Sequence, residues 1–234
     1  MAQGRAFRQQ KKTGRVRRFF YDNGLSIVLC SCFLAFWAGQ ALTGHRQYNE
    51  DLNEHGQSAI NLTDYLRSDH FLEATAENWE SEFVQMFAYV LFTVFLYQKG
   101  SSESKKPGES EAVDREAKRS SKNVPWPVQK GGVILKLYEN SLSLAFLLLF
   151  LIAFSLHATA GARLYSREQQ LHGSPPVSVS EYLGTSRFWF EALQNWQSEF
   201  LAIGSMVVLS IFLRQKGSPE SKPVDSPHSQ TGSD

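Results

Sequence analysis

The sequence predicts an all-α integral membrane protein whose four transmembrane helices form two tandem hairpins of the same orientation. Three observations lead to this fold class. Apolar segments recur four times along the 234 residues, the second half of the chain repeats the first, and basic residues gather on one side of the predicted spans. The near balance of 24 basic and 23 acidic residues argues against a nucleic-acid partner.

The internal repeat sets the boundaries of the predicted units. Shifted by 117 residues, 21–105 aligns with 138–222 without a gap, and about 30 of the 85 paired positions are identical. Each copy contains a matching motif, NWESEF or NWQSEF, directly before an apolar run. We expect a basic arm, a first repeat, a linker, a second repeat and a tail, with bounds 1–20, 21–106, 107–137, 138–216 and 217–234.

Each repeat supplies two predicted spans. The first kind, 24–44 and 141–161, is about 20 residues long without a formal charge, which is enough to cross a hydrocarbon core. The second kind, about 79–97 and about 196–214, has a shorter apolar run that continues a helical spacing of aromatic residues. Because the internal segment 141–161 aligns with 24–44, we interpret 24–44 as a permanent anchor and not as a cleaved signal peptide.

The distribution of basic residues predicts the orientation. The arm, linker and tail together carry 19 Lys and Arg residues, whereas the two loops inside the repeats carry five. Both termini and the linker are therefore expected in the cytoplasm, and both loops outside. Two repeats of one orientation imply a pseudo-two-fold axis along the membrane normal. The predicted partner is the lipid bilayer, with anionic lipid heads as a further partner of the N-terminal basic arm.

Helix ends can be read from both copies. His-Gly pairs predict that the first helix of each repeat continues beyond the membrane and ends with a left-handed glycine. Capping boxes predict a short external helix in each loop, followed by a second helix that begins near 68–69 or 185–186. The signals are His55–Gly56 with His172–Gly173, and Asn61 to Asp64 with Ser178 to Glu181.

The inner ends carry different signals. Lys99 and Lys216 are expected in the last turn of the second helices, with Gly100 and Gly217 as C-caps. Beyond them, the linker and the tail are rich in Ser, Lys, Glu and Pro, a composition typical of disorder.

A polar helix face at the outer membrane surface is the candidate site. Its residues are Asn78, Glu82, Asn195, Glu199, Gln40 and His157, and Trp79 and Trp196 are predicted interfacial anchors. Such a cluster serves either as hydrogen-bonding glue between helices or as a ligand, ion or proton site. We expect Glu82 and Glu199 each to tie its own hairpin. The sequence predicts no catalytic residue, cofactor or metal site, because it contains no nucleophile–base set and no phosphate loop.

The two cysteines, Cys30 and Cys32, lie two positions apart in the first span. Positions i and i+2 of a helix do not face each other, so a local disulfide is geometrically poor. We interpret both as small side chains that face lipid or a core. A CxC metal site is the alternative, although the segment offers no nearby imidazole or carboxylate.

The motifs NWxSEF, a following span and QKGSxESK together resemble an uncharacterised bacterial family of multi-pass membrane proteins, a domain of unknown function. The resemblance covers 18–224 and implies a bacterial inner-membrane protein without a stated activity. We therefore expect a non-enzymatic inner-membrane protein with a structural or envelope-interaction role. The alternative is a small channel or transporter with an outer polar, acidic site.

Overall fold

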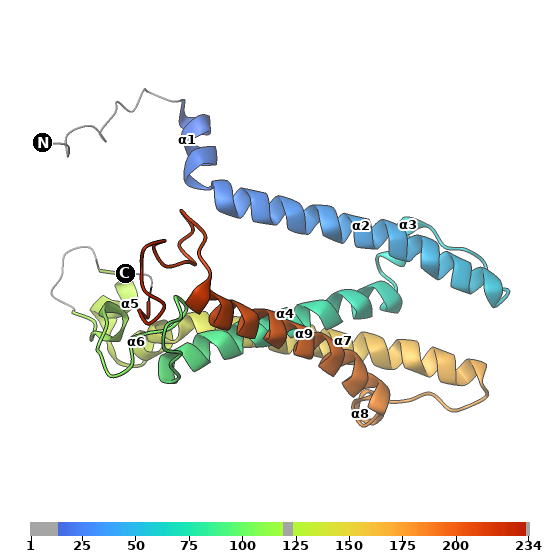
Figure 1. The fold of residues 1–234 in the computed structure, drawn as a ribbon. Helices are drawn as coiled ribbons and strands as arrows, with labels where there is room; N and C mark the ends of the chain where they lie inside the picture. The colour runs from blue at the N-terminus through green and yellow to red at the C-terminus, as the bar shows by residue number, and fades with distance from the viewer. Residues whose placement is uncertain (1–13, 119–123, 233–234) are drawn as a thin grey trace, which may run out of the picture. The chain divides into compact units, whose positions relative to one another are not determined.

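The computed structural model describes residues 14–118 and 124–232, and every regular element within these ranges is helical (Figure 1). The chain forms two compact units, 1–71 and 72–234. Four basic residues of the predicted arm, Arg5, Arg8, Lys11 and Lys12, lie outside the described ranges, as does 119–123 of the linker.

The first unit contains α1 (Arg15–Asp22), α2 (Gly24–Glu54) and α3 (Leu62–Tyr65), and it ends in the first turn of α4 (Asp69–Phe95). The apolar side chains of α2 are largely exposed, at 75% for Leu25 and 60% for Val28, as expected for a helix surface that meets lipid. Cys30 and Cys32 are free thiols on this exposed surface.

The second unit contains the remainder of α4 and six further helical elements. These are η1 (Ala112–Asp114), α5 (Trp126–Lys130), α6 (Gly132–Glu139), α7 (Ser141–Leu171), α8 (Val179–Leu183) and α9 (Ser186–Phe212). Helices α4, α7 and α9 lie side by side (Figure 1). For example, Gln85 of α4 donates a 2.8 Å hydrogen bond to the carbonyl of Glu199 on α9, and the rings of Phe154 and Phe188 join α7 to α9.

The helices of the two copies have corresponding bounds. Both α2 and α7 contain 31 residues, both α4 and α9 contain 27, and each pair begins 117 residues apart. The predicted outer helix ends are confirmed. His55 and His172 occupy the C-cap positions, and the glycines that follow them have φ values of +70° and +76°.

The predicted external helices and their caps are also confirmed. Asn61 accepts a hydrogen bond from the Asp64 backbone at the start of α3, and Ser178 and Glu181 form a reciprocal capping box on α8. The second helices begin at Asp69 and Ser186, within the predicted positions.

A repeated contact positions each external helix. Tyr65 of α3 and Tyr182 of α8 are each 1% exposed, and each places its ring against a glycine of the preceding long helix. A Cβ atom on Gly161 would lie 2.6 Å from the Tyr182 hydroxyl, and Gly44 is crowded in the same way by Tyr65. Glycine at these two positions therefore makes the close approach possible.

The prediction for the inner helix ends is wrong. α4 ends at Phe95 and α9 at Phe212, so Lys99 and Lys216 lie beyond the last turn. Gly100 and Gly217 do have positive φ values, but each sits in a four-residue turn closed by a backbone hydrogen bond, from Ser101 to Gln98 and from Ser218 to Gln215. The repeated QKGS motif therefore encodes a turn that follows the helix, in which glycine takes the left-handed third position.

The linker and tail differ from the disorder that their composition suggests. The described part of the linker contains η1, α5 and the start of α6. In the tail, Lys222 is 2% exposed, and its ammonium group donates to the carbonyls of Gly100, Pro227, His228 and Gln230. Ser101 and Ser210 share a buried 2.9 Å hydrogen bond. The Lys222–Gly100 and Ser101–Ser210 contacts join segments more than 100 positions apart, and local composition contains no signal for such contacts.

Two helices within the described ranges, α2 and α7, are long and apolar enough to cross a membrane. They contain the predicted spans 24–44 and 141–161. The other two predicted spans, about 79–97 and about 196–214, fall largely in α4 and α9 but extend two residues beyond the ends of these helices, which carry more polar residues.

Candidate functional site: a buried carboxylate–histidine cluster

His157 lies at the centre of a buried polar cluster in the second unit. It projects from α7 one turn before the predicted outer end of that span, and its side chain is 0% exposed. The imidazole lies against Phe188 of α9, with ring centroids 4.8 Å apart. Thr185 caps α9 by accepting a hydrogen bond from the Phe188 backbone, which fixes the start of α9 and so the place of Phe188 and the residues that follow.

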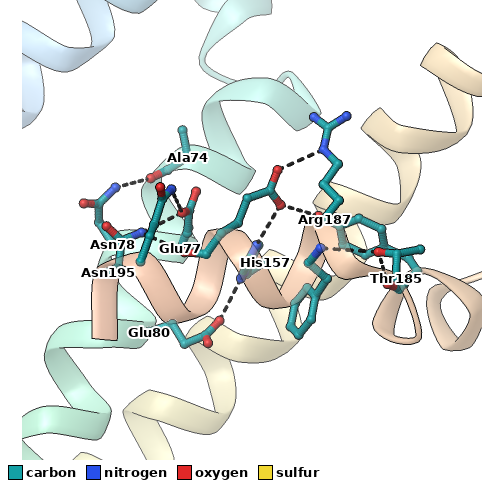
Figure 2. Close-up of polar contacts among 12 residues, drawn as sticks. Ala74, Glu77, Asn78, Glu80, His157, Thr185, Arg187 and Asn195 are labelled. Atoms are coloured by element: carbon teal, nitrogen blue, oxygen red, sulfur yellow. Dashed lines mark hydrogen bonds and ion pairs between the residues drawn. The ribbon is translucent and has the colours of Figure 1, made fainter. Parts of the chain in front are cut away.

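Glu80 of α4 has one hydrogen-bond partner on α7 and another on α9. Its carboxylate, also 0% exposed, lies 2.8 Å from His157 Nδ1 and accepts a 3.1 Å hydrogen bond from the indole of Trp196. Figure 2 shows Glu80 of α4 approaching the ring of His157. Because a buried carboxylate without partners is very costly, these two contacts account for its burial.

Glu191 and Arg187 form the outer side of the cluster. Glu191 accepts hydrogen bonds from the Tyr182 hydroxyl (2.7 Å) and from Arg187 Nε (2.9 Å), and Arg187 also pairs with Glu168 of α7. Burial acts to raise the pKa of Glu191, but its contacts with His157, Tyr182 and Arg187 lower that pKa to about 2. Burial acts to lower the pKa of Arg187, and the two carboxylates raise it. Both groups are therefore charged at neutral pH.

Two further carboxylates of α4, Glu73 and Glu77, belong to the cluster. Glu77 accepts a 2.6 Å hydrogen bond from the amide of Asn195 on α9 (Figure 2). Glu73 is 8% exposed and has no hydrogen bond to the described residues. Burial, together with the nearby charges of Glu191 and Glu77, raises the pKa of Glu73 to about 7.

Three groups in this cluster could hold a metal ion. The ligand atoms of Glu73, His157 and Glu191 all lie within 4.8 Å of one another. His157 Nε2 is buried without a hydrogen-bond partner, and it lies 3.8 Å from the nearer oxygen of Glu191, beyond hydrogen-bond length. Imidazole and carboxylate groups are common ligands of divalent metals.

Only some of the site residues predicted from the sequence belong to this cluster. His157, Asn195 and Trp196 belong to the cluster, where His157 meets Glu80 and Glu191 and not Glu82 or Glu199. The other predicted residues have different surroundings. Asn78 donates to the Ala74 carbonyl, Glu82 is exposed, Glu199 and Trp79 are half-buried, and Gln40 is half-buried in the first unit.

Sequence reasoning missed Glu73, Glu77, Glu80, Arg187 and Glu191. It concentrated on residues that are identical in both copies, such as Glu82 and Glu199. The differences between the copies carry a partial signal, because these ionisable residues are not kept in the opposite copy. The pairs, cluster residue first, are Glu73 with Phe190, Glu77 with Gln194, Glu80 with Gln197, His157 with Gln40, and Glu191 with Ala74.

Over the residues that the structure describes, the regular elements are all helical, two helices are long and apolar enough to cross a membrane, and the buried ionisable cluster includes His157 of one of them. The chain belongs to the family described as Domain of unknown function (DUF6766), whose profile matches residues 16–233. No curated protein and no solved structure matches the chain.

Proposed function

We propose that the protein is a non-enzymatic, multi-pass protein of the bacterial inner membrane with a structural or envelope-interaction role. It crosses the bilayer four times, through 24–44, about 79–97, 141–161 and about 196–214, with both termini in the cytoplasm. The two hairpins are tandem copies related by a pseudo-two-fold axis along the membrane normal. The bilayer is its principal partner, and the N-terminal basic arm contacts anionic lipid heads.

The corresponding helix bounds support the duplicated topology. If α2 and α7 cross the membrane, then α4 and α9 must return the chain, because the basic linker and tail lie at their inner ends. The length of α4 and α9, 27 residues each, corresponds to about 40 Å of helix at 1.5 Å per residue. That length suffices for a hydrocarbon core of about 30 Å together with an outer interfacial turn.

The observation that carries the proposed role is the internal pairing of the cluster. Glu80 bonds α7 and α9, Glu77 bonds α9, and Glu191 bonds α8 and its own helix. These contacts give each of the three carboxylates at least one hydrogen-bond partner, and they connect α4, α7, α8 and α9. This is the behaviour of polar groups that hold helices together in a membrane.

A reporter fusion tests the topology. A reporter fused after Ser110 should give a cytoplasmic signal, and one inserted after Ser174 should give a periplasmic signal. A periplasmic signal from the Ser110 fusion would overturn the proposed orientation.

A small channel or transporter is the second candidate, and the burial of Glu80 and His157 within the proposed spans favours it. Proteoliposomes with the wild-type protein, the Glu80→Gln variant and the Glu82→Gln, Glu199→Gln double variant would be compared for proton and cation flux. Flux that depends on Glu80 would support this candidate. No flux in the wild type would exclude transport of the ions tested, and equal flux in all three would remove these carboxylates from the path.

A further inference from the structure

We propose that Glu73, His157 and Glu191 bind one divalent metal ion of the Zn²⁺ or Mn²⁺ class, with Glu80 orienting the histidine. The site lies within the second unit, and the inference goes beyond the proposed structural role. It rests on the local arrangement of these side chains and is independent of how many times the chain crosses the membrane.

The free nitrogen of His157 is the first reason for this proposal. With Nδ1 bonded to Glu80, the other ring nitrogen points toward two carboxylates but has no hydrogen-bond partner in a fully buried position. A lone pair facing carboxylate oxygens in such a place is unfavourable unless a positive charge lies between them. Either a second proton on the ring or a metal ion would supply that charge.

The surroundings match the outer shell of known metal sites. Metal-binding histidines almost always give their other nitrogen to a carboxylate or carbonyl, which fixes the ring and its tautomer. Glu80 occupies this position at 2.8 Å from Nδ1. Glu191 is held in turn by Tyr182 and Arg187, so both ligands are oriented before any ion arrives.

Charge also favours a cation. Four carboxylates, Glu73, Glu77, Glu80 and Glu191, surround the single imidazole. Arg187, the guanidinium in contact with Glu191, is shared with Glu168. One divalent ion would offset most of the negative charge that the described contacts leave uncompensated, in a place where carboxylate repulsion is weakly screened.

The ligand types select the class of ion. One nitrogen and two carboxylate oxygens suit Zn²⁺, Mn²⁺ and related first-row ions, whereas Mg²⁺ and Ca²⁺ prefer oxygen alone. In tetrahedral Zn²⁺ sites with bonds of about 2.0–2.1 Å, ligand atoms lie about 3.4 Å apart. The three groups, which are within 4.8 Å of one another here, would therefore move closer on binding. Glu73 can do so because no hydrogen bond to a residue of the described ranges holds its carboxylate.

The pseudo-equivalent positions have no such ligands. Gln40, Ala74 and Phe190 replace the histidine and the two carboxylates in the opposite copies. We therefore expect one ion per chain and not two.

Direct metal binding tests the proposal. Tag-free, full-length protein in detergent is stripped with a chelator and titrated with Zn²⁺ or Mn²⁺ against a chromogenic competitor, and bound metal is counted by mass spectrometry. We expect one ion per chain. Glu73→Gln and Glu80→Gln should each weaken binding by about 10-fold to 100-fold, and His157→Ala by at least as much.

Two control variants separate this site from others. Glu82→Gln changes an exposed carboxylate of the same helix and should bind normally, as should the Cys30→Ser, Cys32→Ser double variant. Because Glu73 makes no hydrogen bond to any described residue, Glu73→Gln should fold. Added Zn²⁺ should raise the unfolding temperature of the wild type and of Glu82→Gln but not of Glu73→Gln.

Three results would overturn the proposal. The first is that the wild type binds neither ion, and the second is that Glu73→Gln binds with wild-type affinity. The third is that the Cys30→Ser, Cys32→Ser double variant no longer binds the ion. In the first two cases a doubly protonated His157 would supply the positive charge of the cluster, because it would form ion pairs with Glu80 and Glu191. In the third, the CxC segment would be the metal site.

Discussion

Replacing Glu80 by alanine should reveal how much the cluster contributes to folding. Glu80 is fully buried and bonds one partner on each of two other helices, His157 at 2.8 Å and Trp196 at 3.1 Å. Removing one member of a buried ion pair costs about 3–5 kcal/mol in soluble proteins. Interhelical hydrogen bonds in a membrane protein average only about 0.6 kcal/mol, because the unfolded state also finds partners in the membrane.

The surroundings of Glu80 decide between these values. The Glu80→Ala substitution would leave two donors, on His157 and Trp196, without their partner, and the His157 ring also faces Glu191. We therefore expect Glu80→Ala to lower the free energy of unfolding by about 2–4 kcal/mol, between the soluble and membrane values. Glu80→Gln keeps an acceptor and should cost about 1 kcal/mol.

The assay is reversible unfolding in mixed micelles with increasing dodecyl sulfate, followed by circular dichroism and tryptophan fluorescence. The second copy provides a matched control, because Gln197 occupies the equivalent position and is exposed. Gln197→Ala should change stability by less than about 0.5 kcal/mol. If Glu80→Ala had as small an effect as Gln197→Ala, the cluster would not hold the three helices together.

Two further predictions concern packing and the tail. Gly161→Ala would place a Cβ atom 2.6 Å from the Tyr182 hydroxyl and should lower the free energy of unfolding by about 1–3 kcal/mol. Gly204→Ala serves as the control, because a Cβ atom there meets open space and should not lower stability. Equal unfolding temperatures of the two variants would contradict the close approach. Lys222→Met removes the ammonium group that binds four backbone carbonyls, so limited proteolysis of the tail should accelerate several-fold, while the exposed Lys216→Met leaves it unchanged. Equal cleavage of both lysine variants would show that Lys222 does not restrain the tail.

Local signals predicted the helices well. The capping residues Asn61 and Ser178 and the left-handed glycines Gly56 and Gly173 depend on neighbours a few positions away, so the sequence contains what determines them. The inner ends were misplaced because Gly100 fits a helix C-cap and a tight turn equally well. Local chemistry does not distinguish these two uses of glycine.

The site was harder to predict because it depends on helix rotation. In α4, Asn78, Glu82 and Gln85 share one face, and Glu73, Glu77 and Glu80 share another with similar spacing. The structure buries Glu80 and exposes Glu82. Spacing gives a face but not the direction in which it points, since that depends on packing against α7 and α9. His157 was identified because an imidazole in an apolar run is conspicuous by itself.

The proposed metal site around His157 can be examined by spectroscopy of the bound ion. X-ray absorption at the zinc edge, on the chain loaded with one equivalent of Zn²⁺, identifies the ligand atoms and their distances. We predict a shell of nitrogen and oxygen at about 2.0–2.1 Å that includes one imidazole, which disappears in His157→Ala. A sulfur shell at about 2.3 Å would instead assign the ion to Cys30 and Cys32, and a shell without imidazole would contradict the site.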